Sequence, residues 1–168
     1  MALIDSGDYE AAYDLLSGLN YKDSVSKLDS IKVPYKKVLL SKKANVGSYI
    51  TFGSYEQDNN KANGKENIEW LVLAKEENRI LVISKYGLEF QPYDTFYANV
   101  TWETCSLRKR LNETFFNDAF SAAERAMIPS VIVSADKNPG YNTSPGKNTT
   151  DQVFLLSLIE AIEYFTSN

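Results

Sequence analysis

Histidine is absent from the 168-residue chain, and cysteine occurs once, at Cys105. Without histidine, the chain lacks the commonest general base and the commonest transition-metal ligand in proteins. A single cysteine cannot form a disulfide within the chain, so cysteine usage does not identify a cellular compartment. The usual partners of a catalytic thiol and of a transition-metal site are therefore missing.

Dense basic runs and long apolar runs are also lacking. The net charge is −4, and the largest basic clusters are at residues 36–37, 42–43 and 108–110. Surfaces that follow phosphate backbones normally carry a basic patch, so we expect no nucleic-acid partner. No segment approaches the roughly 18 apolar residues of a membrane helix, and residues 1–5 do not resemble a signal peptide. We therefore expect no membrane span.

Aromatic residues, by contrast, are plentiful. They make up 12% of the chain, with 11 tyrosines and 8 phenylalanines, while 43% of residues are hydrophobic and 24% charged. Aromatic rings bury large areas in a core, and tyrosine-rich surfaces also suit recognition. The composition therefore predicts a globular domain and leaves open whether the rings form a core or a binding face.

Residues 5–31 have the pattern of two short helices. Gly18 ends the first, and Asp23-Ser24 caps the start of the second. The segment resembles one tetratricopeptide-like repeat, which cannot bury its apolar face alone. It is either a protein-interaction arm or a linker that packs on the domain. Residues 32–45 hold Pro34 and five lysines, and form a linker or a continuation of the second helix. We expect a helical arm over 1–45.

Strand patterns begin at Val46. Alternation predicts a strand over 46–52 ended by Gly53, a polar loop over 57–67, and a hairpin of strands 68–74 and 79–84. Short strands are also expected at 131–133 and 153–156, separated by an exposed loop over 135–151.

Helices are expected over 102–118 and after two capping boxes, Ser121 with Glu124 and Ser157 with Glu160, the last helix reaching about Phe165. The fold expected over 46–168 is an α+β domain. It has a small mixed or antiparallel sheet with two to three helices packed on it. A helical hairpin precedes it.

Four sequence blocks occur in order between Val46 and Phe165. They are VGSYITFGSYEQ, IEWLVLAKEENRILVISKYGLEFQPY, TWETCSLRKRLNETFFNDAFSAAERAMI and DQVFLLSLIEAIEYF. Together they resemble an uncharacterised bacterial domain-of-unknown-function family. The resemblance implies a C-type-lectin-like or formylglycine-generating-enzyme-like fold. Arg110 stands where that family has tryptophan, and the chain stops before the family's closing strands. An exposed sheet edge would then favour a homodimer or a swapped assembly.

Catalytic and metal chemistry are not expected. Formylglycine-generating relatives use a pair of cysteines, whereas this chain has only Cys105, at the start of a predicted helix. The loop from Asp58 to Glu69 resembles an EF-hand, but Ala62 takes a ligand position and Gly64 comes one residue late. We therefore expect no catalytic residue, no metal and no cofactor.

Trp102, Glu103, Arg108 and Asn112 form the most structured constellation. One interpretation is a ligand or partner site that uses tryptophan stacking and arginine hydrogen bonds. The alternative is structural: Trp102 in the core, Glu103 stabilising the helix start and pairing with Arg108 or a neighbour, and Asn112 bonded to loop backbone. Tyr141, in the long loop, adds a candidate recognition surface.

The leading hypothesis is a non-catalytic module that binds an unknown protein or glycan ligand, with the bacterial cell surface or exterior favoured over the cytoplasm. A structural or protein-interaction role, through the helical arm and an open sheet edge, is the alternative. An enzyme of the formylglycine-generating type is the third hypothesis.

Overall fold

The computed structural model describes residues 2–19, 21–77 and 79–166. The chain divides into two compact units, which we call the first unit (residues 1–52 and 69–85) and the second unit (residues 53–68 and 86–168). Helices and antiparallel strands both occur, so the expected α+β class is confirmed. The expected domain division between residues 45 and 46 stays a prediction.

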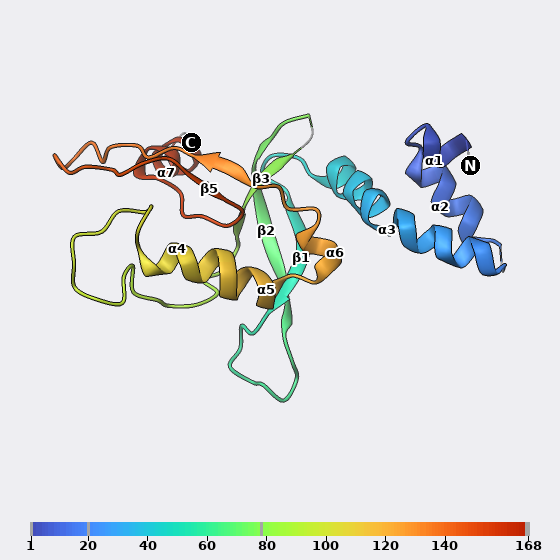
Figure 1. Ribbon diagram of the computed structural model, residues 1–168, viewed down its shortest axis with the longest axis horizontal. Coiled ribbons are helices and arrows are strands. Elements are labelled where there is room, and N and C mark those ends of the chain that lie inside the picture. Colours follow the sequence, from blue (N-terminus) through green and yellow to red (C-terminus); the bar gives the residue numbers. More distant parts are fainter. Residues whose placement is uncertain (1, 20, 78, 167–168) are drawn as a thin grey trace. The chain divides into compact units, whose positions relative to one another are not determined.

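Three helices open the first unit (Figure 1): α1 (Ala2–Asp5), α2 (Tyr9–Ser17) and α3 (Lys22–Lys43). Asp8 caps α2, because its side chain accepts a hydrogen bond from the Ala11 amide at 3.2 Å. Tyr13 and Tyr35 stack with ring centroids 4.0 Å apart, which pairs α2 with α3. The helical hairpin is confirmed. Of the two alternatives for residues 32–45, the structure has the helical continuation, with Pro34 inside α3.

A three-stranded sheet follows, in the order β1-β2-β3. Its strands are β1 (Tyr49–Tyr55), β2 (Glu66–Lys75) and β3 (Ile80–Ser84). β2 and β3 pair antiparallel, and their turn is closed by the Glu76 amide, which donates to the Arg79 carbonyl at 2.8 Å. The predicted hairpin is confirmed.

The core of the first unit lies between the end of α3 and the sheet. Ala44, Ile50 and Val72 are buried together. Partly buried apolar side chains pack against them, namely those of Leu40, Trp70, Ile80 and Val82. The Trp70 indole also donates to the Phe52 carbonyl at 2.6 Å, so this large ring buries its polar group with a partner.

The prediction of a strand over 46–52 was wrong at both ends. Residues 45–48 form a turn in which the Ser48 amide donates to the Asn45 carbonyl at 2.9 Å, so β1 begins only at Tyr49. Gly53 does not end the strand. Its φ is +73°, and a Cβ there would lie 2.6 Å from the Phe120 ring. This glycine is needed for a close approach between β1 and a phenylalanine.

The second unit has an aromatic core around that approach. Phe115, Phe116 and Phe120 are buried. The Phe115 ring lies 5.0 Å from that of Tyr55 and 6.0 Å from that of Phe120, centroid to centroid. Such tilted and edge-on pairs are the favoured geometries for aromatic rings.

The remaining elements are α4 (Ser106–Arg110), the π-helix η1 (Leu111–Phe115), α5 (Phe116–Ala119), α6 (Ala122–Arg125), β4 (Val131–Val133), β5 (Thr149–Asp151) and α7 (Leu158–Phe165). α4, η1 and α5 follow one another as one rod (Figure 1). The helix predicted from residue 102 therefore begins at 106, because residues 101–104 form a turn closed on the Thr101 carbonyl. Cys105 is its N-cap and not part of its first turn. Both capping boxes are confirmed.

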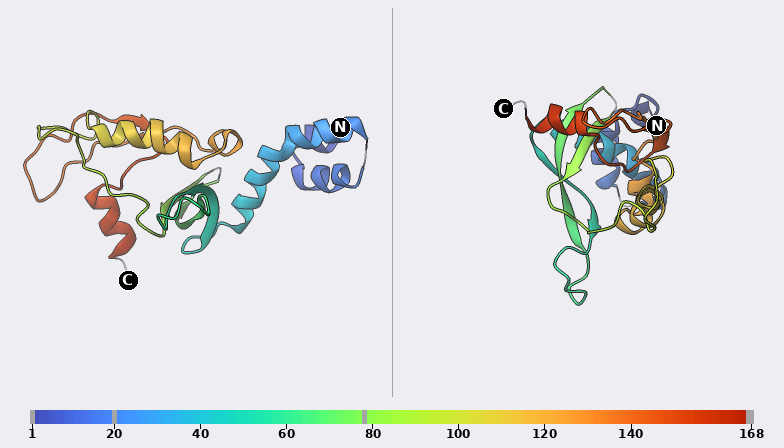
Figure 2. Two further views of the ribbon diagram at one scale, coloured as in Figure 1. Left: turned by 90° about the horizontal axis from the view of Figure 1, so that it is seen from below. Right: turned by 90° about the vertical axis from the view of Figure 1, so that its left-hand side faces the viewer.

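The strand predicted at 153–156 was also wrong. The strand that pairs antiparallel with β4 is β5, at residues 149–151, which the sequence placed in an exposed loop. Segments 86–100 and 134–148 extend at the end of the second unit where α4 begins (Figures 1 and 2). Among the described residues, no helix is both long and apolar enough to cross a membrane.

Candidate functional site

Asp151, the last residue of β5, is the centre of a buried polar network. Its side chain is 1% exposed and accepts from Trp102 Nε1 at 3.0 Å, Arg108 Nε at 2.8 Å and Thr149 Oγ1 at 2.5 Å. Charge-assisted bonds of this kind are the strong class, and a buried carboxylate needs them. We call Trp102, Arg108, Thr149 and Asp151 the Asp151 network.

Arg108 connects this network to the turn before α4. Its Nη1 donates to the Glu103 backbone carbonyl at 3.2 Å, whereas its ion pair is with Asp151. The Glu103 carboxylate instead accepts from the Lys147 amide at 3.2 Å and lies 3.9 Å from the Lys147 ammonium. Of the expected partners for the Glu103 carboxylate, the structure therefore has a neighbour, Lys147.

Asn112 ties the helical rod to the chain after β5. Its Oδ1 accepts from the Gln152 and Val153 amides at 2.8 and 3.1 Å, and its Nδ2 donates to the Val153 carbonyl at 2.8 Å. The expected bonding of Asn112 to loop backbone is confirmed. These bonds occupy backbone groups that a strand at 153–156 would have paired with another strand. Nδ2 also donates to the Arg108 carbonyl at 3.1 Å, next to the point where α4 gives way to the π-helix η1.

A cavity of about 730 Å³ opens beside these residues, and we call it the larger cavity. Its walls come from four parts of the chain: residues 94–96 and 100, residues 103–106, 108–109 and 112–113, Ser130, and residues 150–152. Its ionisable walls comprise four carboxylates and two basic groups: Asp94, Glu103, Glu113, Asp151, Arg108 and Lys109.

Three of the five candidate residues named from the sequence line the larger cavity: Glu103, Arg108 and Asn112. Trp102 is not among the lining residues but holds Asp151 through its indole. Tyr141 is 72% exposed in the long loop and is not among the lining residues. The sequence reasoning missed Asp151 as a site residue. The signal was a carboxylate two residues before the apolar run VFLL, because an aspartate that is buried beside such a run needs a partner.

The segment over residues 93–100 also contributes to the wall of the larger cavity, and hydrogen bonds hold it to the start of α4. Asp94 Oδ1 accepts from the Ser106 amide at 2.7 Å, and the Leu107 amide donates to the Tyr93 carbonyl at 3.2 Å. The bond from the Ser106 amide is the largest cause that lowers the Asp94 pKa, so this carboxylate stays ionised. Burial, followed by contact with Cys105, raises the pKa of Tyr93 to about 12.

A smaller cavity of about 370 Å³ lies against the same segment, and we call it the aromatic pocket. It is lined by Tyr93, Asp94, Thr95, Phe96, Tyr97, Ala98 and Val100. Phe96 and Tyr97 are 77% and 111% exposed. The two cavities share Asp94, Thr95 and Phe96 among their walls.

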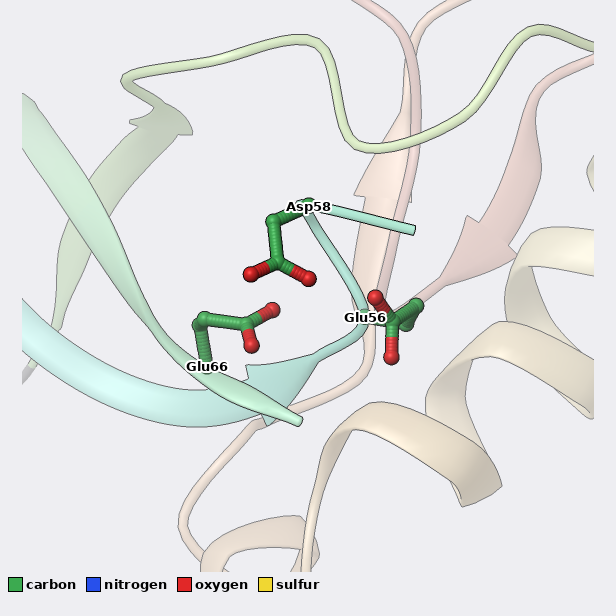
Figure 3. A group of neighbouring side chains, drawn as sticks. All are labelled: Glu56, Asp58 and Glu66. Atoms are coloured by element: carbon green, nitrogen blue, oxygen red, sulfur yellow. The ribbon is translucent and has the colours of Figure 1, made fainter. Parts of the chain in front are cut away.

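Among the described residues, Glu56, Asp58 and Glu66 form the one group of carboxylates able to hold a metal ion, with their oxygens within 4.8 Å of one another (Figure 3). Protein donors already serve two of them. The Asn60 amide donates to Asp58 at 2.7 Å, and the Gln57 amide donates to Glu66 at 2.7 Å. Hydrogen bonds, first that from Asn63, lower the Asp58 pKa. The expectation of no metal stays a prediction.

Comparison with known proteins finds one family. No curated protein and no solved structure matches the chain. The lectin-like fold expected from the resemblance stays a prediction. The family described as "Domain of unknown function (DUF6273)" matches residues 77–168, which hold the Asp151 network and both cavities. The chain belongs to this family of domains of unknown function.

Proposed function

We propose that the protein is a non-catalytic binding module whose ligand or partner occupies the larger cavity. The observation that carries this proposal is the construction of the cavity on the Asp151 network. Its volume of about 730 Å³ falls within the roughly 300–1,000 Å³ of typical ligand pockets. Binding sites gain affinity when their walls are held in place before the ligand arrives. Buried bonds to Asp151 and Asn112 provide such support.

The groups around the cavity favour binding over chemistry. The chain has no histidine, and the buried Cys105 thiol contacts the Trp102 carbonyl at 3.5 Å. Asp151 is held by Arg108 and two further donors, and so serves the structure. A nucleophile needs a base beside it and a base needs an orienting group. The absence of an enzymatic role, of a cofactor and of a nucleic-acid partner is part of this proposal.

The C-type-lectin-like fold and a location at the bacterial cell surface also belong to the proposal. The ordered blocks between Val46 and Phe165 support them by resemblance.

A ligand panel with a blocked cavity tests the binding function. The probes are basic, neutral and acidic octapeptides, disaccharides and nucleoside monophosphates, each in a thermal unfolding assay. A probe at about 100 times its Kd stabilises the protein by about 2.7 kcal/mol, which raises the unfolding temperature by several degrees. Thr150 is exposed and lines the cavity, so Thr150→Trp fills the space and leaves the Asp151 network intact.

The matched control is Thr51→Trp, another exposed threonine on a strand, in the first unit. We expect Thr150→Trp to abolish the shift produced by the binding probe and Thr51→Trp to retain it. A panel without any binder, or a probe that still binds Thr150→Trp, contradicts the proposal.

A second candidate function is self-assembly through the helical arm. Leu15, Tyr21 and Val25 are 60%, 74% and 54% exposed on or beside α2 and α3. Exposed apolar side chains on the same helical hairpin are candidates for an interaction surface. The helical hairpin therefore supports an assembly role beside ligand binding.

A further inference from the structure

The aromatic pocket combines rings with negative charge and has no basic wall. Its lining holds three aromatic residues and one carboxylate, Asp94. The whole segment from Tyr86 to Val100 contains two acidic residues and no lysine or arginine. Aromatic faces and carboxylates both attract organic cations, the first through the ring quadrupole and the second through charge.

The exposed rings of this pocket follow a stretch of backbone that is hydrogen-bonded to the start of α4. The Thr95 amide donates to Ser106 Oγ at 2.8 Å, and the Phe96 amide donates to Asp94 Oδ2 at 3.3 Å. The first of these bonds, together with that from the Ser106 amide to Asp94, holds residues 94 and 95 to the start of α4, and the exposed rings of Phe96 and Tyr97 follow directly. Aromatic side chains exposed beside an anchored stretch of backbone are typical of recognition surfaces.

The ligand must be longer than one side chain if it uses both cavities. Residues 94–96 and Val100 are walls of both, so a ligand that enters the aromatic pocket continues beside Phe96 into the larger cavity. In the larger cavity, Arg108 and Asp151 neutralise each other and Glu103 lies beside Lys147. The Asp94 and Glu113 carboxylates then remain against one basic group, Lys109. The charge of the larger cavity therefore also favours a positively charged ligand.

We propose that the partner is an extended peptide segment that places an arginine or lysine side chain in the aromatic pocket and lays adjacent residues in the larger cavity. This inference rests on the proposed binding function and adds the chemical class of the partner. An extended peptide supplies a cation for the Phe96 and Tyr97 rings and for Asp94. It also brings backbone donors and acceptors for the polar walls of the larger cavity.

The test is a set of acetylated, amidated octapeptides that carry one arginine, lysine, citrulline, glutamine or glutamate in the same small, polar contexts. Binding is measured by calorimetry with the full chain. We expect the arginine and lysine peptides to bind best. Citrulline has the shape of arginine without its charge, and we expect it to weaken binding about 2- to 5-fold per lost cation contact.

Protein variants then locate the cation. Phe96→Ala removes a wall ring, and Asp94→Asn removes the charge while keeping an acceptor for the Ser106 amide. We expect each to weaken the arginine peptide about 2- to 5-fold and to leave the citrulline peptide unchanged, because the cation contact is already lost. The control is Phe90→Ala, a phenylalanine that is 98% exposed in the same segment and lines neither cavity.

Three outcomes would overturn the inference. It fails if citrulline or glutamate peptides bind as well as arginine peptides, if Phe96→Ala acts no more strongly than Phe90→Ala, or if no peptide binds. The proposed function is judged separately. A disaccharide or a neutral peptide that is excluded by Thr150→Trp would support a binding site in the larger cavity while refuting a basic peptide as its partner.

Discussion

The side chain of Asn112 provides the hydrogen bonds that a neighbouring strand would otherwise give to residues 152 and 153. Asp151, one residue before Gln152, accepts hydrogen bonds from Trp102 and Arg108. At the scale of single residues, two polar side chains thus decide the path of the chain after β5 and the wall of the larger cavity.

Asn112→Ala should lower the free energy of unfolding by about 3–4 kcal/mol, because four part-buried backbone groups lose a bond to its side chain. Each such group costs about 1 kcal/mol, the low end of the range for buried, unpaired groups. The control is Asn117→Ala, since Asn117 is exposed and its side chain bonds only the Glu113 carbonyl within the described part of the chain. We expect that control to cost less than about 1 kcal/mol. Urea denaturation measures both, and equal losses would contradict the role given to Asn112.

Arg110 forms an ion pair with Glu89. Its Nε and Nη2 donate to the Glu89 carboxylate at 3.0 and 2.5 Å, and Tyr55 donates to the same carboxylate at 3.1 Å. Bonding to Arg110 is the largest cause that lowers the Glu89 pKa below its ordinary value of 4.5. A lowered folded-state pKa gives stability above the ordinary value, which is lost as pH falls through the folded one.

Glu89→Gln should therefore flatten the loss of stability in acid. We expect the wild-type protein to lose stability between about pH 5 and pH 3 more steeply than the variant. Glu77→Gln, at an exposed glutamate of the β2–β3 turn, should leave the wild-type slope unchanged. The check is urea denaturation at half-unit pH steps. If the unfolding free energies of wild type and Glu89→Gln fall in parallel as the pH is lowered, the ion pair does not cause the loss of stability in acid.

At the scale of elements, the approach of β1 to Phe120 places the aromatic core of the second unit. Gly53 and Gly64 both have positive φ, +73° and +87°, but only Gly53 has neighbours where a Cβ would stand. Alanine substitutions at these two glycines therefore distinguish the cost of backbone strain from the cost of a steric contact. Alanine at Gly64 meets only the cost of positive φ, about 1–2 kcal/mol.

Gly53→Ala should cost about 2–4 kcal/mol of unfolding free energy, because overpacking against Phe120 adds to the same backbone strain. Thermal and urea unfolding of Gly53→Ala and Gly64→Ala measure the difference. If both variants lose the same stability, the contact between Gly53 and Phe120 is not what requires glycine.

Local patterns predicted the elements that local chemistry determines. Both capping boxes, the β2–β3 hairpin and the helical hairpin follow from residues close in sequence. The prediction of a strand over 153–156 failed because an apolar run does not reveal that a side chain 40 residues earlier will bond to the backbone at its start. The aromatic pocket was missed for a similar reason, since residues 93–100 are fixed by bonds to α4 and not by a pattern of their own.

At the scale of the whole molecule, the family match covers residues 77–168 and includes both cavities, whereas the helical arm precedes it. Ligand binding and assembly therefore belong to different parts of the chain in our proposals. They can be tested independently with variants of each part.

Self-assembly through the arm predicts a mass that depends on concentration. We expect sedimentation velocity to show dimers or larger species for the wild-type chain. The double variant Leu15→Gln and Val25→Gln should be monomeric, because it makes two exposed apolar positions polar. A wild-type chain that stays monomeric at millimolar concentration would refute assembly by this route.

The most direct test of the central claim is the amide NMR spectrum of the full chain during titration with the tightest probe of the ligand panel. The account predicts that the largest shift changes fall on residues 94–96, 103–106 and 150–152, and that Thr150→Trp removes them. Changes centred on α2 and α3, or a spectrum that no probe alters, would contradict a binding site in the larger cavity.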